Sequence, residues 1–355
     1  MYSNTINVIG AMSGTSLDGL DLCLVSFDCD NYTNFKILNS QTYNYSSEWI
    51  NRLSNAINLK EKDLNKLDDE FGILISNYIN NFIMNIGSPI IKLVSSHGHT
   101  VFHQPEKGIT KQIGNGKLIF NNININLICD FRTQDVKLGG QGAPLVPIGD
   151  LHLFKNFKYC LNLGGFGNIS IKKNKSIKAF DICPVNTVLN YYSKKLGYPF
   201  DENGKLSEKG SVNINLLKKL NSMNFYKIEG PKSLGIEYVN EKVIPLINSF
   251  SINYNDILIT FIEHITDQIK ISLIGNSKNE TVLVTGGGTY NKTIIKSLIN
   301  KLKCEVFLPD KEIINNKEAL IFAYMGLLRF KNKVNCLKTV TGASKDHSSG
   351  KIFKN

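Results

Sequence analysis

Two glycine-rich hairpin loops, one opening each half of the chain, constrain the fold of this sequence most strongly. The first loop, residues 10–21, separates two apolar runs that are expected to be strands, and the second, residues 164–168, does the same. In both halves, further strand patterns then alternate with helical patterns. This alternation predicts an α/β protein with two lobes.

The clearest expected helix covers residues 63–86, where apolar residues recur at three- and four-residue spacing. A second hairpin is expected from strands at 111–113 and 118–120. Pro184 is expected in the first turn of a helix. The remaining expected elements are strands at 35–45, 90–95, 126–131, 177–181, 281–284 and 305–308, and helices at 184–196, 207–222, 256–273 and 317–330.

A glycine-rich bend at residues 132–144 is the expected boundary between the lobes. The first lobe is therefore expected to hold residues 1–140 together with about 335–355. The second lobe is expected to hold residues 141–334.

The net charge of +11, from 41 Lys and Arg against 30 Asp and Glu, suggests an anionic partner. Because the lysines are scattered, we expect a small phosphate compound and no nucleic acid. No signal peptide or membrane-length apolar run is found, so a cytoplasmic protein without membrane contact is expected. Seven cysteines without a CxxC pair favour neither a disulfide framework nor a zinc ribbon.

The first loop combines backbone freedom with polar groups. Its glycines permit close approaches, and successive turn N–H groups can form an anion-binding nest. Asp18 and Asp21 would repel a bare phosphate, so they would face one through Mg²⁺. A plain polar hairpin turn is the alternative. The glycines and hydroxyl residues are Gly10, Gly14, Gly19, Ser13, Thr15 and Ser16.

Three glycine turns lie at expected strand ends, at 10–19, 164–167 and 286–288. No Walker A sequence is present, and no Gly-x-Gly-x-x-Gly leads from a strand into a helix. The third turn precedes a helix, whose N-terminus favours an anion or a nucleotide edge. Together, the turns indicate phosphate binding of another type.

Two polar residues lie at expected strand ends. Asp181 there is a candidate general base, and the alternative is that it caps the following helix. Arg132 is a candidate for gripping a carboxylate with two donors. It also has Asp130 and Asp135 as alternative partners.

His97, His99 and His103 follow another apolar run and raise the possibility of a metal site. The remaining histidines are His152, His264 and His347, and none is paired with a carboxylate at ligand spacing. Hydrogen bonding to a ligand or to the loop itself is therefore the preferred interpretation.

Taken together, these stretches resemble the anhydro-N-acetylmuramic acid kinases, a branch of the sugar kinase/Hsp70/actin superfamily. The resemblance covers nearly the whole chain. Its first stretches are Gly-Ala-Met-Ser-Gly-Thr-Ser-Leu-Asp-Gly (10–19), Ser-His-Gly-His-Thr-Val-Phe-His-Gln-Pro (96–105), Gln-Ile-Gly (112–114), Asp-Phe-Arg-Thr-Gln-Asp-Val (130–136) and Gly-Gly-Gln-Gly-Ala-Pro-Leu-Val-Pro (139–147). The later ones are Asn-Leu-Gly-Gly-Phe-Gly-Asn-Ile (162–169), Phe-Asp (180–181), Pro-Lys-Ser-Leu-Gly-Ile-Glu (231–237), Gly-Gly-Gly-Thr-Tyr-Asn (286–291), Lys-Glu-Ala-Leu-Ile-Phe-Ala (317–323) and Val-Thr-Gly-Ala (340–343).

The resemblance implies two RNase H-like lobes that close over ATP, with the active site in the cleft between them. Asp18 and Asp21 would hold Mg²⁺ through the ATP phosphates. The implied ATP-binding residues are Gly14, Thr15, Ser16, Leu17, Asp18, Gly19, Leu20 and Asp21 in the first phosphate loop, Gly164, Gly165 and Asn168 in the second, and Gly286, Gly287 and Gly288 at the nucleotide edge.

The resemblance also implies a substrate, 1,6-anhydro-N-acetylmuramic acid from peptidoglycan turnover. Asp181 would take a proton from the water that opens the anhydro bridge, and the freed O6 would receive the γ-phosphoryl group. The residues implied to hold the sugar are His97, Thr100, Arg132 and Glu318. The state of the chain, monomer or homodimer, is left open.

This sequence departs from the family pattern at several positions. The usual Phe-Asp-Thr-Gly-Pro-Gly-Asn is here Phe-Asp-Ile-Cys-Pro-Val-Asn (180–186), and His99 and Gln104 replace a usual glutamine and arginine. The altered turn either reshapes the pocket beside Asp181 or packs differently. Two alternatives follow: a non-catalytic ATP-binding sensor of the same fold, and a metal-dependent hydrolase that uses His97 and His99.

Overall fold

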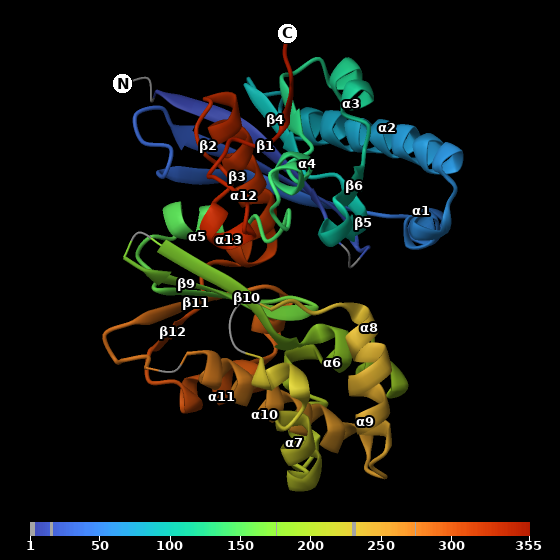
Figure 1. The fold of residues 1–355 in the computed structure, drawn as a ribbon, viewed down its shortest axis with the longest axis vertical. Helices are drawn as coiled ribbons and strands as arrows, with labels where there is room; N and C mark the ends of the chain where they lie inside the picture. The colour runs from blue at the N-terminus through green and yellow to red at the C-terminus, as the bar shows by residue number, and fades with distance from the viewer. Residues whose placement is uncertain (1–3, 15–16, 175, 229–231, 274) are drawn as a thin grey trace. The chain divides into compact units, whose positions relative to one another are not determined.

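The computed structural model describes residues 4–14, 17–174, 176–228, 232–273 and 275–355, and the chain divides into two compact units (Figure 1). The first unit is Met1–Phe154 with Asn316–Asn355, and the second is Lys155–Asn315. Residues 141–154 and 316–334 therefore belong to the first unit. The expected boundaries had assigned both segments to the second lobe.

A six-stranded sheet forms the centre of the first unit, in the order β13-β7-β4-β1-β2-β3. β1, β2 and β3 are antiparallel neighbours, and β4 and β7 continue the sheet parallel to β1. β5 and β6 form a separate hairpin. The strands are β1 (Thr5–Ser13), β2 (Gly19–Asp28), β3 (Phe35–Asn44), β4 (Leu93–Ser96), β5 (His99–Gln104), β6 (Ile109–Ile113), β7 (Leu127–Cys129) and β13 (Lys351–Phe353).

Helices cover both faces of this sheet. Side chains alternate along β1, so Ile9 and Ala11 join the core beneath α2, whereas Gly10 faces α12 at Ala319. The helices of the unit are α1 (Ser47–Ser54), α2 (Glu61–Asn85), α3 (Gly116–Ile123), α4 (Thr133–Lys137), α5 (Pro147–His152), α12 (Lys311–Phe330, with its first residues in the second unit) and α13 (Lys338–Thr341).

The second unit contains a five-stranded sheet in the order β10-β9-β8-β11-β12. Apolar residues on one face of the sheet pack against α6, α10 and α11. The strands are β8 (Tyr159–Leu163), β9 (Phe166–Lys173), β10 (Ser176–Pro184), β11 (Thr281–Thr285) and β12 (Glu305–Phe307). The helices are α6 (Asn186–Lys195), α7 (Ile214–Asn221), α8 (Ile236–Tyr238), α9 (Ile244–Asn248), α10 (Tyr254–Ser272) and α11 (Lys292–Lys301).

Five strands have the same order in both units, and β13 adds a sixth, antiparallel strand at the edge of the first. In each, three antiparallel strands are joined by hairpins, and the next two strands add in parallel beside the first. This 3-2-1-4-5 order is that of RNase H-like domains. The prediction of an α/β protein with two RNase H-like units is confirmed.

Two of the local predictions are wrong. Residues 118–120 lie in helix α3, whose first turn is capped by the Asn115 side chain, and not in a strand. Pro184 lies at the end of β10, and helix α6 begins two residues later at Asn186. In both places a short segment is compatible with two structures, and tertiary packing selects one of them.

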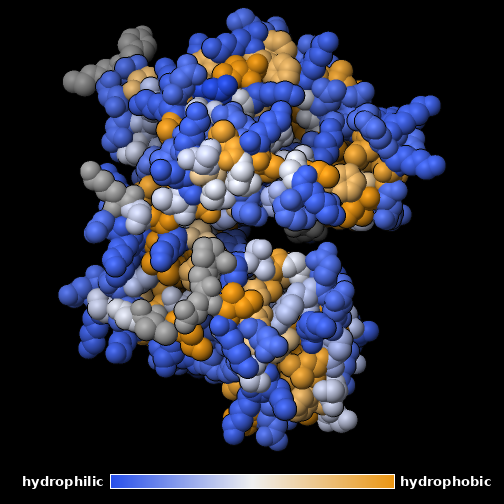
Figure 2. Space-filling model, viewed as in Figure 1, coloured by the Kyte–Doolittle hydropathy of each residue, from blue (hydrophilic) through white to orange (hydrophobic). Residues whose placement is uncertain are grey.

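The visible face of the molecule is mostly hydrophilic, with apolar residues in patches among polar ones (Figure 2). Within the described part of the chain, none of the helices combines the length and apolar character that crossing a membrane requires.

Candidate active site

Four polar residues form a row across the sheet of the second unit. In the strand register, Asp181 of β10 lies opposite Asn168 of β9, Asn168 opposite Asn162 of β8, and Asn162 beside Thr285 of β11. Their neighbours along the strands, such as Leu161 and Ile169, belong to the apolar core. Because side chains alternate, the row lies on the opposite face of the sheet from that core.

The third glycine turn adjoins this row. Gly286 follows Thr285 with a φ of +85°, and a Cβ on it would lie 2.6 Å from Oδ1 of Asn162. The structure thus brings together Asp181, Asn168 and the 286–288 turn. Asn162 was missed as a site residue, although it lies in the same motif as Asn168. The signal available was its position two residues before the glycine turn, which a hairpin places opposite Asn168 on the same face of the sheet.

Backbone groups of residues 232 and 234 hold Asp181 in place. Its Oδ2 accepts a hydrogen bond of 2.9 Å from the N–H of Leu234, and its own N–H donates to the carbonyl of Lys232. Burial raises the pKa of Asp181, and the Leu234 N–H opposes this rise in part. The alternative that Asp181 caps the following helix is wrong, because α6 begins at Asn186.

The residues that depart from the family pattern after Asp181 are packed in the core. Ile182, Cys183 and Val185 are all buried and belong to the main apolar cluster of the second unit. The strand has an irregular register between Asp181 and Cys183. The altered turn is therefore accommodated by apolar packing behind the sheet.

The 164–168 loop is tied to the start of α6. The N–H groups of Val185 and Asn186 donate to the carbonyls of Gly165 and Gly164, and the Thr187 hydroxyl donates to Gly165 at 2.7 Å. These contacts connect the second phosphate-loop candidate to the residues that directly follow β10, the strand that carries Asp181.

In the first unit, most of the predicted 10–21 loop is strand: residues 10–13 end β1, and residues 19–21 begin β2. Thr15 and Ser16 lie outside the described residues. Asp18 is exposed, whereas Asp21 is half-buried and accepts a hydrogen bond of 2.6 Å from the Thr42 hydroxyl. Burial raises the pKa of Asp21, the Thr42 hydrogen bond lowers it, and the Asp18 charge raises it again.

Arg132 is anchored by two hydrogen bonds. Its Nε donates to Nε2 of His97 at 3.0 Å, and its Nη1 donates to the carbonyl of Gly142 at 2.7 Å. His97 is buried, and its Nδ1 lies 2.9 Å from the carbonyl of Gly98. A proton on Nδ1 leaves Nε2 as an acceptor, which is the neutral tautomer that Arg132 requires. Burial, and next the Arg132 charge, lower the pKa of His97 well below its usual value, consistent with a neutral ring.

Glu318 lies on α12, and the charges of Glu318 and Arg132 each shift the pKa of the other residue. Burial raises the pKa of Glu318, the charges of Lys317 and Arg132 lower it, and that of Asp21 raises it. Burial lowers the pKa of Arg132 to about 10, and Glu318 is the strongest opposing charge. The half-buried Glu318 is thus under the influence of two predicted residues, because both the Arg132 charge and the Asp21 charge shift its pKa.

The remaining predicted residues are less closely linked. Thr100 pairs with Gln112 in the β5–β6 hairpin, and its hydroxyl makes no hydrogen bond to any described residue. Nδ1 of His99 lies 3.2 Å from the Ser13 hydroxyl. Neither His97 nor His99 belongs to a potential metal-ligand group among the described residues, so the structure gives the metal-hydrolase interpretation no support.

Paired RNase H-like units with glycine turns at their strand ends are the architecture of the actin-like kinases and ATPases, and the fold assigns the chain to this class. The family model for anhydro-N-acetylmuramic acid kinase matches residues 6–355. The chain belongs to this family. The prediction of family and of a kinase, made from the sequence motifs, is confirmed.

Similar proteins align with this chain over nearly their full length. Anhydro-N-acetylmuramic acid kinases of Haemophilus influenzae and Vibrio cholerae are 33% and 32% identical, with 97% of each chain covered in both comparisons. Among solved structures, the ADPNP-bound activator of 2-hydroxyisocaproyl-CoA dehydratase from Clostridium difficile aligns with a TM-score of 0.44 and 13% identity, over 92% of this chain and 96% of that one. A ROK family glucokinase from Streptomyces griseus aligns with a TM-score of 0.41 and 10% identity, over 90% and 99%.

Proposed function

We propose that this protein is an ATP-dependent kinase that opens 1,6-anhydro-N-acetylmuramic acid and phosphorylates O6, giving N-acetylmuramic acid 6-phosphate and ADP. The reaction would recycle peptidoglycan fragments in the cytoplasm, where ATP is available. Family membership supports the substrate. The observation that carries the chemistry is the position of Asp181 in the polar row beside Asn168.

Asp181 acts as the general base. It accepts a proton from a water molecule as that water attacks the anomeric carbon and the bond from this carbon to O6 breaks. O6 then takes the γ-phosphoryl group, and ADP leaves. The Leu234 N–H orients the carboxylate through Oδ2. Burial raises the pKa of Asp181, and a carboxylate whose pKa is raised is a stronger base than an exposed aspartate.

Arg132 binds the lactyl carboxylate of the sugar. Nε and Nη1 are already engaged by His97 and Gly142, and these bonds fix the plane of the guanidinium. Its Nη2 donates to no described residue and is available for the ligand. His97 orients Arg132, and Glu318 and Thr100 serve as partners for the sugar hydroxyls and amide.

The glycine loops bind the phosphates of ATP, and Mg²⁺ would be held by Asp18 and Asp21. The donor set fits this ion, because Asp21 uses Oδ1 for Thr42 and Oδ2 has no hydrogen-bond partner among the described residues. Bound there, Mg²⁺ would neutralise phosphate charge during transfer.

The test is to incubate the protein with Mg·ATP and 1,6-anhydro-N-acetylmuramic acid and to measure ADP by a coupled assay. Phosphorus NMR would identify the phosphomonoester. Plain N-acetylmuramic acid is the control, because it lacks the anhydro bridge. ADP formation that depends on the anhydro sugar is expected. ATP binding by folded protein without any sugar-dependent ADP would instead identify a non-catalytic sensor and would overturn the proposal.

A further inference from the structure

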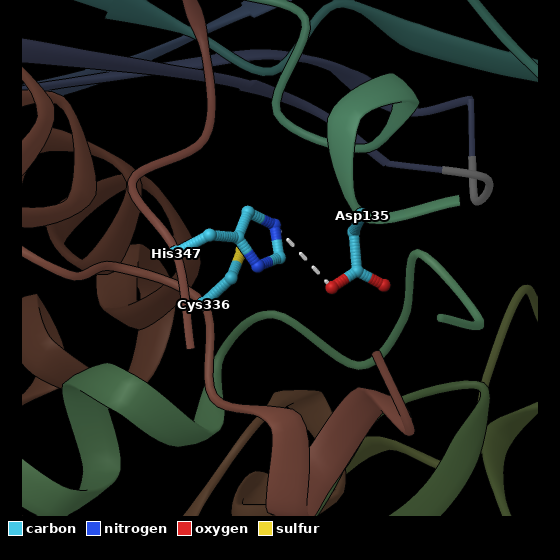
Figure 3. Close-up of side chains that lie close together, drawn as sticks. All are labelled: Asp135, Cys336 and His347. Atoms are coloured by element: carbon cyan, nitrogen blue, oxygen red, sulfur yellow. Dashed lines mark ion pairs between the residues drawn. The ribbon is translucent and has the colours of Figure 1, made fainter. Parts of the chain in front are cut away.

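Three buried side chains with metal-binding atoms meet in the first unit, outside the residues assigned to the reaction. Asp135 projects from α4, and Cys336 and His347 lie opposite each other in an isolated antiparallel bridge of the C-terminal segment (Figure 3). At most 5% of any of the three residues is exposed. Their ligand atoms all lie within 4.8 Å of one another.

The hydrogen bonds around His347 leave one ring nitrogen without a partner. Nδ1 lies 3.2 Å from the carbonyl of Lys345 and can donate its proton there. Nε2 is buried and has no hydrogen-bond partner among the described residues. It points at Oδ1 of Asp135, 3.5 Å away (Figure 3). In the neutral tautomer with its proton on Nδ1, Nε2 and Oδ1 are both acceptors, so they do not satisfy each other.

Asp135 is already oriented by hydrogen bonds from its neighbours, as metal-binding carboxylates are. Its Oδ2 accepts from the N–H of Gly142 and its Oδ1 from the Thr341 hydroxyl, both at 2.7 Å. Each oxygen keeps a further lone pair. A cation placed between Oδ1 and Nε2 of His347 would use a lone pair of each.

We propose that Asp135, Cys336 and His347 bind a divalent transition-metal ion of the zinc class. Imidazole, thiolate and carboxylate are the ligands that this ion selects in proteins. Bonds of about 2.0–2.1 Å to a tetrahedral ion separate two ligand atoms by roughly 3.3 Å, close to the spacing of Nε2 and Oδ1. As the sulfur–metal bond forms, the Cys336 thiol proton leaves to solvent. The charges then balance, because two anionic ligands face one divalent ion, and a water molecule completes the shell.

The ion would have a structural role. It would fasten the C-terminal segment to α4, and Asp135 in turn holds Gly142, whose carbonyl receives Arg132. The site would therefore support the loop behind Arg132 without contacting the substrate. A protonated His347 paired with Asp135 in the absence of metal is the competing explanation.

The experiment uses the full chain, stripped of metal with a chelator and then titrated with zinc in the presence of a competing indicator. About one tight equivalent per chain is expected, together with a rise in Tm. Cobalt(II) in place of zinc should give a thiolate-to-metal charge-transfer band. Cys336→Ser should remove this band, and Cys336→Ser and His347→Gln should each weaken zinc binding by about 10-fold or more. Cys304→Ser removes a buried thiol of the second unit and should change neither the charge-transfer band nor the affinity for zinc.

Several outcomes would overturn the proposal. Absence of a tight equivalent would do so, as would equal zinc binding by the Cys336→Ser variant or a cobalt spectrum without a thiolate band. A metal-independent Tm that falls with rising pH in the parent protein, but not in His347→Gln, would establish the competing ion pair instead. Should His347→Gln fail to fold, the Cys336→Ser variant and the cobalt spectrum still decide the question.

Discussion

Asp181 combines an oriented carboxylate, partial burial and a neighbour in the 164–168 hairpin. Asp181→Asn keeps the size of the side chain but removes the base, so kcat should fall by about 10²–10⁴-fold while ATP binding is retained. Calorimetric titration with ATP and the coupled ADP assay measure the two properties separately. Asp310→Asn alters an exposed aspartate of the same unit and is the control. Turnover at the parent rate in Asp181→Asn would exclude this residue as the base.

The same carboxylate should set the acidic limb of the pH–rate profile. The base must be ionised, and burial raises the pKa of Asp181 above its ordinary value of 3.8. Activity should therefore fall as the pH drops through this raised pKa, which lies above 3.8. A profile of kcat/KM against pH, obtained from initial rates, tests this. Asp181→Glu should move the limb, and an unmoved limb would assign it to another group, with Glu318 the first candidate.

Arg132 should contribute mainly to sugar binding. Arg132→Lys keeps a charge but loses the planar fork that is anchored by His97 and Gly142. We expect KM for the anhydro sugar to rise by about 10-fold or more, with KM for ATP nearly unchanged. Steady-state kinetics with each substrate varied in turn measure both values. Arg52→Lys, on α1, is the matched control, and an equal effect there would contradict the assignment.

Sequence motifs predicted the site residues only through local patterns. Asp181 and Asn168 are 13 positions apart in sequence, and the hairpin that joins them makes their proximity predictable once the strand register is known. The group formed by Asp135, Cys336 and His347 has no such pattern. About 200 residues separate Asp135 from the other two, and no ligand spacing exists along the chain to indicate it.

At the scale of elements, the close packing of β1 against α12 depends on Gly10. A Cβ at this position would lie 1.9 Å from the carbonyl oxygen of Ala319, a backbone atom that cannot rotate away. Gly10→Ala should therefore lower the free energy of unfolding by about 1–3 kcal/mol and displace Glu318 on the same helix. Urea unfolding measures the loss. Gly287→Ala meets only a side-chain atom at 3.6 Å and should cost much less; similar losses in the two variants would contradict this account.

Elements in which the apolar repeat continues over many residues were predictable, and short elements were less so. Helix α2 was expected at 63–86 and is Glu61–Asn85, because its apolar residues repeat over many turns. Residues 118–120 offered too few positions to distinguish strand from helix. Packing of α3 in the core, together with the Asn115 cap, selects the helix. Helix α12 begins at Lys311 and not at 317. Its first six residues, Lys-Glu-Ile-Ile-Asn-Asn, hold only two adjacent isoleucines, which are too few to show a helical apolar repeat.

At the scale of the whole molecule, the cysteines should all be reduced. In the structure six of the seven cysteines are buried, and Cys29 is partly accessible. Thiol titration without reductant should give seven groups after unfolding, and only Cys29 should react rapidly in the native protein, because burial excludes the reagent. A lower count after unfolding, restored by reductant, would reveal a disulfide that the structure does not contain.

The second unit is continuous in sequence, whereas the first is assembled from both ends of the chain. During synthesis, all of Lys155–Asn315 has emerged before α12 is complete and before β13 can pair with β7. Since domains fold as units while the chain is made, the second unit can reach its native structure first. The first unit must wait for α12 and for its edge strand β13, so a released chain that ends near residue 316 would hold one complete unit and one incomplete unit.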